Sequence, residues 1–357
     1  MNKRVDSLNF IRILGMSMIL LFHAKLLYGF SVGFPWLDDM ISIGAIFVTV
    51  FFMLSGFGLR KSYATLSLHD RSSILQYYKK RVMSIYPLFL LLSIVALMFQ
   101  FRVMDDLVET LMRLPIQFSM LHILFGKEMH GFLFNDNCWY ISTLFVLYLL
   151  FPLLNACVNR LPMRAKAVLC IVLWMLSSSI YFFCVYGTEL TFLDYYPNPF
   201  LRIPEFMIGM ILADLSEAIS ILLSQQRKWE PASTWKQRWI SPGILVIVTI
   251  FSAVALTLLY PHFKQETNLY STLVIPCTSV VFLCMANWEW LNRIGSKRTI
   301  RWLAGLGLEV YLCQSFATLT LTKIKVPGAV DELWFMGLTI LFAVVVHGTN
   351  KRKKREV

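Results

Sequence analysis

The chain has 357 residues, of which 57% are hydrophobic and 15% are charged, and its mean hydropathy is +0.63. Soluble domains carry about 25% charged residues, so this composition excludes a water-soluble globule, a disordered chain and a collagen. The net charge of +12 does not indicate a nucleic-acid partner, because membrane proteins concentrate Lys and Arg in their cytoplasmic loops. We therefore predict an all-α, polytopic integral membrane protein.

Ten segments are long and apolar enough to cross a bilayer, for which a helix needs about 20 apolar residues. They are residues 8–28, 39–59, 85–101, 138–158, 167–187, 199–216, 241–260, 269–287, 303–321 and 332–349. An eleventh stretch, 107–125, has apolar residues at helical spacing but also contains Pro115 and charged residues. We predict an amphipathic or re-entrant helix there, within a single transmembrane domain over residues 1–357.

The distribution of basic residues predicts the orientation of these ten spans. Of the 33 Lys and Arg residues, 24 fall in the two termini and in the loops 60–84, 159–166, 217–240 and 288–302. An even number of spans puts all these segments on one side of the membrane. The positive-inside rule makes that side the cytoplasm, so we expect both termini there. The apolar run after the first residues contains Arg12 and lacks a cleavage pattern, so we expect a retained first span.

Known soluble-enzyme motifs do not occur. The seven cysteines show no CxxC spacing and mostly lie in apolar runs, so we expect reduced, buried side chains and no metal site. No GxGxxG, Walker, HExxH or GxSxG pattern is present, which gives dinucleotide, ATP, zinc-protease and hydrolase functions no support.

The first span carries two ionisable residues, Arg12 and His23. Ionisable groups inside a bilayer are expensive and need a reason. The two residues are eleven positions apart, so on a helix their side chains differ in direction by only about 20° and are separated by about 16 Å along the helix axis. We expect this face to line a common cavity, with Arg12 toward the cytoplasm and His23 toward the outside. The structural alternatives are a polar helix contact for His23 and a snorkelling side chain for Arg12.

Glu205, in the span 199–216, is predicted to lie at a depth similar to that of His23. A carboxylate that holds an imidazole in one tautomer is a familiar way to make a general base. The alternative of equal weight is an ion pair between Glu205 and Arg202, three residues earlier on the same helix.

Four segments, in order, resemble motifs of the acyltransferase-3 family of integral membrane acyltransferases. These are RVDSLNFIR (4–12) leading to FHA (22–24), FFMLSGF (51–57), YKKRVMSIYP (78–87), and WYISTL (139–144) leading to YLLFP (148–152). The segments RIPEFMIG (202–209) and LEVYL (308–312) follow in the expected order. The resemblance extends over nearly the whole chain.

The resemblance implies transfer of an acyl group, commonly acetyl, from cytoplasmic acyl-CoA to a hydroxyl of a cell-surface or lipid-linked glycan. It implies that His23 is the catalytic base and that Arg12 and Arg81 receive CoA, without a metal. It also implies a multi-pass protein among the lipids of a bacterial cytoplasmic membrane. Two positions depart from the family pattern. At the first, Ser84 stands where the family's RxxR motif has its second arginine, so we expect Lys80 or its neighbour Lys79 to make that phosphate contact instead. Gln314 stands where the family often has histidine.

This chemistry is consistent with the residues themselves. A sugar hydroxyl needs a base to take its proton as it attacks a thioester, and a neutral imidazole suits that role. The developing oxyanion needs a hydrogen-bond donor, for which Tyr140 and Trp139 are equal candidates. We assign Trp139, Tyr140 and Arg202 to substrate binding, and Glu205 to catalysis beside His23.

Two other functions compete with this hypothesis. The first is a transporter or flippase for a lipid-linked sugar, with Arg12, His23 and Glu205 lining its pathway. Transporters often contain internal repeats, and this chain shows none between its halves. The second is a glycan polymerase, but such enzymes tend to have a large outer loop, and the longest here is 102–137.

Overall fold

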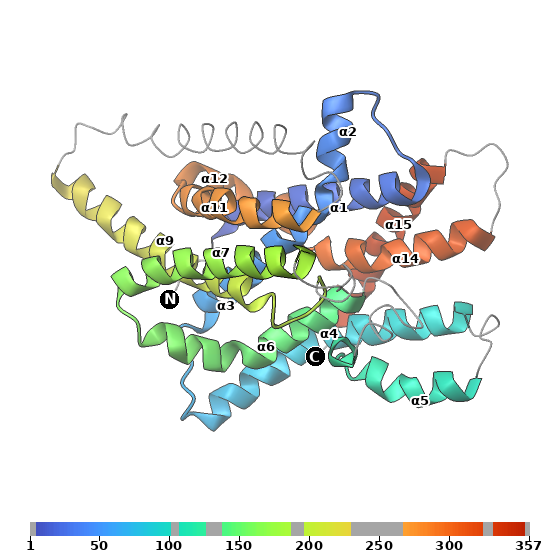
Figure 1. Ribbon diagram of the computed structural model, residues 1–357, viewed down its shortest axis with the longest axis horizontal. Coiled ribbons are helices and arrows are strands. Elements are labelled where there is room, and N and C mark those ends of the chain that lie inside the picture. The colour runs from blue at the N-terminus through green and yellow to red at the C-terminus, as the bar shows by residue number, and fades with distance from the viewer. Residues whose placement is uncertain are drawn as a thin grey trace.

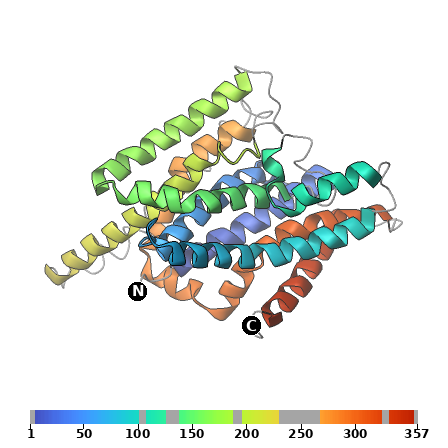
Figure 2. The same cartoon turned by 90° about the horizontal axis from the view of Figure 1, so that it is seen from below.

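The computed structural model describes residues 5–100, 107–125, 138–186, 196–229, 267–323 and 331–353. All regular structure in these ranges is helical, as the composition predicted. Most of the long helices lie side by side along one direction and form an elongated bundle (Figures 1 and 2).

The first part of the chain forms the helices that later surround the site. They are η1 (Asp6–Leu8), α1 (Asn9–Tyr28), α2 (Pro35–Ser42), η2 (Gly44–Ile46), α3 (Phe47–Tyr63) and α4 (Arg71–Gln100). Helix α1 ends at Gly29, whose φ of 75° is left-handed and favours glycine at a helix C-terminus. The side chain of Lys25 donates a hydrogen bond to the carbonyl of Asp38, which ties the end of α1 to α2.

The remaining helices complete the bundle. They are α5 (Leu107–Phe118), η4 (His122–Leu124), α6 (Cys138–Asn159), α7 (Met163–Tyr186), α9 (Ile203–Trp229), α11 (Thr267–Ala286), α12 (Glu289–Gly295), α13 (Arg298–Ala304), α14 (Gly307–Lys323) and α15 (Asp331–Lys353). The predicted amphipathic stretch corresponds to α5 and η4.

Six of the described helices are long and apolar enough to span a membrane, and the bent pair α11–α12 is a seventh candidate. The six are Asp6–Tyr28, Pro35–Tyr63, Cys138–Asn159, Met163–Cys184, Ile203–Gln225 and Asp331–Gly348. Helix α14 has only 17 residues, and α4, which contains residues 85–100 of the predicted span 85–101, is not among the six. The predicted span 241–260 lies outside the described residues. The total of ten spans and the orientation of the termini therefore stay predictions.

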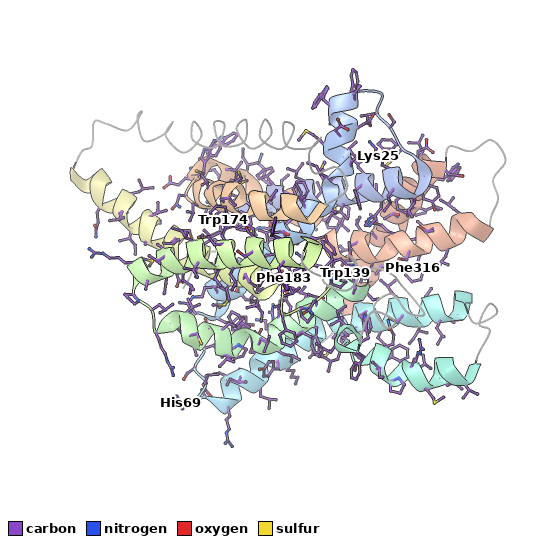
Figure 3. All side chains as sticks on the ribbon, viewed as in Figure 1. Lys25, His69, Trp139, Trp174, Phe183 and Phe316 are labelled. Carbon is purple, nitrogen blue, oxygen red and sulfur yellow. The ribbon has the colours of Figure 1, made fainter. Side chains whose placement is uncertain are left out.

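The outer surface of the bundle is apolar. Helix α7, for example, exposes Val168, Ile171, Met175 and Phe183. Such a face is unfavourable in water and suits contact with lipid. Figure 3 shows Phe183 and Trp174 on this helix, and Lys25 and His69 toward opposite ends of the bundle.

Helices α3 and α9 cross in direct backbone contact. A Cβ atom on Gly56 would lie 2.0 Å from the carbonyl oxygen of Phe206, and one on Gly209 would lie 2.0 Å from that of Met53. Small residues allow helix backbones to approach closely in membranes. This contact explains the glycine of the FFMLSGF segment.

A buried network of charges joins four helices at one end of this crossing. Arg60 of α3 binds both carboxylate oxygens of Asp214 of α9 at 2.8 Å, and Lys166 of α7 binds the same carboxylate at 2.6 Å. The second partner of Arg60 is Asn155 of α6, whose Oδ1 lies 2.6 Å from the guanidinium. Bidentate, hydrogen-bonded pairing offsets the cost of burying these charges.

The start of α1 is fixed by the segment that follows α11. Asn292 accepts a hydrogen bond from the backbone N–H of Ser7 at 2.9 Å, and Asp6 forms an ion pair with Arg301 at 2.7 Å. A Cβ on Gly295 would lie 2.2 Å from the carbonyl oxygen of Asp6, so the two segments touch. These contacts set the position of Arg12, about one and a half turns further along the chain.

Candidate active site

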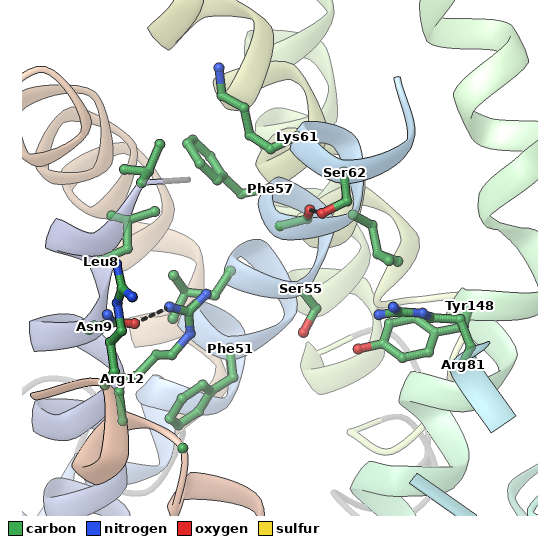
Figure 4. A pocket seen from close by; sticks show the side chains of 17 residues that line it. Leu8, Asn9, Arg12, Phe51, Ser55, Phe57, Lys61, Ser62, Arg81 and Tyr148 are labelled. Carbon is green, nitrogen blue, oxygen red and sulfur yellow. Dashed lines mark hydrogen bonds between the residues drawn. The ribbon is translucent and has the colours of Figure 1, made fainter. Parts of the chain in front are cut away.

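A cavity of about 760 Å³ opens beside the first turns of α1. Its walls carry four basic side chains: Arg12 of α1, Lys61 of α3, Arg81 of α4 and Arg301 of α13. Figure 4 shows Arg12 and Arg81 on opposite sides of this cavity, with Ser55 between them and Lys61 near one edge. The structure thus brings together the two arginines that the sequence predicted as anion-binding residues.

Both arginines are held in place by neighbouring side chains. Nη1 of Arg12 donates to Oδ1 of Asn9 at 2.7 Å, a contact drawn in Figure 4. Nη2 of Arg81 donates to the hydroxyl of Tyr63 at 3.3 Å, and its guanidinium carbon lies 5.4 Å from the centre of that ring. The bond to Tyr63 uses one N–H of the Arg81 guanidinium, which lines the cavity and has further N–H donors for a ligand. Planar guanidinium groups bind phosphate well.

A narrower cavity of about 220 Å³ continues from the wide one. The two share Arg12, Phe51, Tyr148 and Ala304 in their walls. The narrow cavity is otherwise mostly apolar, with polar groups from Tyr140, Tyr148, Tyr311 and Gln314. A charged opening therefore leads into a confined, largely apolar space inside the bundle.

One face of α1 runs along this path. Arg12, Met16 and Ile19 line the narrow cavity, and His23 is the next residue in the same helical series. The polar groups within reach of its ring are the backbone of Ile19 and the side chain of Gln314, which itself lines the cavity. His23 is not itself part of the cavity wall. It lies just beyond the deep end, on the face that the sequence predicted.

The His23 ring packs edge-to-face on Phe22, with centroids 5.2 Å apart. Its Nδ1 and both amide atoms of Gln314 make no hydrogen bond of normal length and angle to the described residues. The imidazole and the amide are thus neighbours, and the amide and Nδ1 of the imidazole have no other partner among the described residues. Polar groups confined in this way are typical of a binding or catalytic site.

The sequence profile of the acyltransferase-3 family, described as an acyltransferase domain, matches residues 5–348. The chain belongs to this family. It is also similar to Acyltransferase MdmB of Streptomyces mycarofaciens, with 31% identity over 149 residues. That match covers 36% of this chain and 35% of MdmB, so it extends over only about a third of the relative. No solved structure matches the chain.

The chain is thus a member of a family of membrane acyltransferases, and several of its described helices are long and apolar enough to span a membrane. The two cavities described above form the candidate site, because they connect the four basic residues to the part of α1 that precedes His23. Among the described residues, no group of three or more His, Cys, Asp or Glu side chains could hold a metal ion.

The structure gives Glu205 a different partner from the one assigned to it beside His23. Its Oε1 lies 2.7 Å from Nη1 of Arg202 and accepts a hydrogen bond from Thr49 at 3.2 Å. Both members of the pair are fully buried. The alternative that the sequence allowed, an ion pair between Glu205 and Arg202, is therefore the one that the structure contains, with Arg202 just before the first residue of α9. The physical reason is that a fully buried guanidinium needs a counter-charge, and Glu205 lies one turn away.

Arg202, which the sequence analysis assigned to substrate binding, is fully buried and contacts the segment that precedes α9. Its Nε donates to the carbonyl of Tyr196 at 3.0 Å, and its guanidinium carbon lies 4.3 Å from the centre of that ring. Arg202 and Glu205 thus join the start of α9 to the preceding segment and to α3.

The other assigned residues divide in the same way. Tyr140 lines the narrow cavity, whereas Trp139 packs on Tyr140 and Tyr196 and lines neither cavity. Lys80 is exposed and lies outside both cavity walls, because its position on α4 turns it away from Arg81.

Sequence reasoning gave no role to three residues that the structure places in the site. Ser55 lies within hydrogen-bonding reach of the hydroxyls of Tyr140 and Tyr148, and Gln314 lies beside His23. The third residue is Tyr148, which lines both cavities. Ser55 and Tyr148 both belong to the motif segments that resemble the family, and this membership was the only indication of their role in the sequence. Gln314 was visible only as a departure from the family pattern.

Proposed function

We propose that this acyltransferase moves an acyl group, acetyl in the simplest case, from acyl-CoA to a hydroxyl of a cell-surface or lipid-linked glycan. The observation that carries the proposal is the continuity of the two cavities at Arg12 and Tyr148. A charged opening, a confined apolar passage and a histidine at its far end match the order of groups in a CoA thioester, from phosphates to acyl carbon.

The wide cavity supports donor binding. CoA carries several phosphates, and four basic side chains face that cavity. Charge-assisted hydrogen bonds to phosphate are stronger than neutral ones. With the phosphates held by Arg12 and Arg81, the acyl end of the donor would extend into the narrow cavity.

His23 supports the chemical step. In the proposed reaction its imidazole takes the proton of the acceptor hydroxyl as the hydroxyl oxygen attacks the thioester carbon. The bond from that carbon to sulfur breaks, sulfur leaves with its electron pair, and the proton passes from His23 to sulfur. General-base assistance contributes typically 10²–10⁴-fold to a rate.

The proposal includes a location. The basic opening would face the cytoplasm, where acyl-CoA is found, and the acceptor would approach His23 from the outer side of a bacterial cytoplasmic membrane. The excess of Lys and Arg on the predicted inner side supports this orientation.

The test uses purified protein in lipid nanodiscs with acetyl-CoA labelled in the acetyl group. We expect slow release of CoA without acceptor, and transfer of label to the glycan fraction when membranes of the source cell are added. A flippase for a lipid-linked sugar would release no CoA and transfer no label. Absence of both activities with acetyl, propionyl and succinyl donors would contradict the proposal.

A further inference from the structure

Gln314 of α14 is buried at the deep end of the narrow cavity, with 3% of its surface exposed. Both of its amide atoms lack a hydrogen bond of normal geometry to the described residues. A buried amide without hydrogen bonds is unfavourable, and such groups in proteins are usually satisfied. The two partners that this position allows are the ring of His23, which is within reach, and a ligand that enters the cavity that Gln314 lines.

The neighbouring polar groups in the cavity are in a different situation. Tyr140 and Tyr148 both have the hydroxyl of Ser55 within reach, and the ring of Tyr140 packs on Phe52 and Tyr311 at 5.0 and 5.3 Å between centroids. Gln314 is also the cavity-lining residue that reaches His23. Its amide thus lies between the cavity and the base.

We propose that Gln314 binds the carbonyl oxygen of the acyl group through its side-chain N–H and stabilises the negative charge that develops there. This inference rests on the proposed acyl-CoA reaction. When the acceptor oxygen bonds to the carbonyl carbon, the C=O electron pair moves onto the oxygen, and a donor beside it stabilises this charge most. The pair returns as the carbon–sulfur bond breaks, while His23 carries the proton from the acceptor to the sulfur.

This role differs from a positioning role in which Gln314 only orients the imidazole. An orienting amide would change the ionisation of His23, so its removal would shift the apparent pKa in the profile of kcat against pH. A donor to the carbonyl oxygen would leave that apparent pKa in place and lower kcat at every pH.

The chain offers a matched control. Gln117 of α5 is fully buried, and both of its amide atoms also lack hydrogen bonds to the described residues, but it lines neither cavity. Gln314→Met and Gln117→Met make the same chemical change in and away from the site. Methionine keeps the side-chain length and removes the donor.

We expect Gln314→Met to lower kcat by about 10²- to 10³-fold, the usual effect of losing one oxyanion donor. The dissociation constant for CoA, which has no acyl group, should stay within twofold, and Gln117→Met should retain both properties. Gln314→Asn, which keeps an amide but withdraws it by one methylene, should show a smaller loss of the same kind and covers the case in which the methionine variant fails to fold.

A second readout does not depend on turnover. In a His23→Ala background, bound acetyl-CoA labelled with ¹³C at the carbonyl should show a lower C=O stretching frequency than in solution. The shift should disappear when Gln314→Met or Gln314→Asn is added.

Several outcomes would overturn this inference. They are kcat within threefold of wild type in folded Gln314 variants, a shifted apparent pKa that accounts for the loss, an equal loss in Gln117→Met, or an unchanged carbonyl frequency. Failure of the wild-type protein to use any acyl-CoA would instead contradict the proposed function itself.

Discussion

Replacing Gly56 by alanine should destabilise the protein, whereas Gly58→Ala on the same helix should not. A Cβ on Gly56 would meet the carbonyl oxygen of Phe206 at 2.0 Å, whereas Gly58 has nothing within 4 Å. Since ordinary contacts begin near 3.4 Å, α3 and α9 would have to separate by roughly 1.4 Å. Overpacking of this kind costs about 1–3 kcal/mol, and alanine regains about 0.5–1 kcal/mol in helix preference.

The control isolates the steric part, because Gly58→Ala gains the same helix preference without a clash. We expect a net loss of about 1–2 kcal/mol for Gly56→Ala and no loss for Gly58→Ala, measured by unfolding in mixed detergent micelles with increasing sodium dodecyl sulfate. Gly209→Ala should resemble Gly56→Ala, and the double variant should lose less than the sum, because the helices separate once. Equal stability of the Gly56 and Gly58 variants would refute the close crossing.

Three further predictions concern the donor site, a helix start and the orientation. Arg81→Ala should raise the KM for acyl-CoA by about ten- to hundredfold, because it removes a contact worth roughly 1.5–3 kcal/mol. Lys80 is exposed and lies outside the cavity, so Lys80→Ala should leave the KM unchanged. Equal effects of the two substitutions would contradict the assignment of Arg81. Asp70 accepts hydrogen bonds from Ser73 and Ser72, which lower its pKa to about 2. The carboxylate should therefore stabilise the first turn of α4 fully at pH values above its ordinary pKa of 3.8, and this stabilisation should be lost as the pH falls toward 2. Asp70→Ala should speed amide hydrogen exchange in that turn at neutral pH, and unchanged exchange would count against this role. In a cysteine-free background, Asp331→Cys should react with impermeant thiol reagents outside intact cells and His69→Cys only after permeabilisation; the reverse pattern would overturn the orientation.

Helical periodicity predicted the path along α1 because it depends on one helix alone. Arg12, Met16 and Ile19 line the narrow cavity and His23 follows in the same series, as the spacing of eleven residues indicated. Apolar runs located some helices to within a few residues, as for 138–158 against Cys138–Asn159, whereas α9 continues to Trp229, well beyond the predicted end at residue 216. The start of the third predicted span, 85–101, could not be located in this way, because the helix that contains it, α4, already begins in the basic segment at Arg71.

The partners of the polar residues could not be predicted in the same way, because they depend on how separate helices meet. The sequence allowed Glu205 to face either His23 or Arg202, and the buried guanidinium one turn away forms the ion pair. The approach of Gln314 to His23 joins α1 to α14, nearly 300 residues apart in the chain. No local pattern reports such a contact.

The direct contact between the backbones of two helices could not be predicted from the sequence either. The FFMLSGF segment contains Gly56, and Gly58 follows it directly, but the letters alone do not say which of these two glycines meets another helix. Only the crossing of α3 and α9 distinguishes them. The same crossing carries Ser55 toward the tyrosines of α6, so the packing of two glycines helps to build the site.

The most direct test of the account is the rate of acyl transfer by His23→Gln, measured beside its affinity for CoA. Glutamine keeps hydrogen-bonding ability but cannot take a proton, so we expect a loss of at least about 10²-fold in rate with CoA binding and protein yield close to wild type. His23→Ala should be equally inactive. A His23→Gln protein that transfers acyl groups at nearly the wild-type rate would contradict the assignment of His23 as the base.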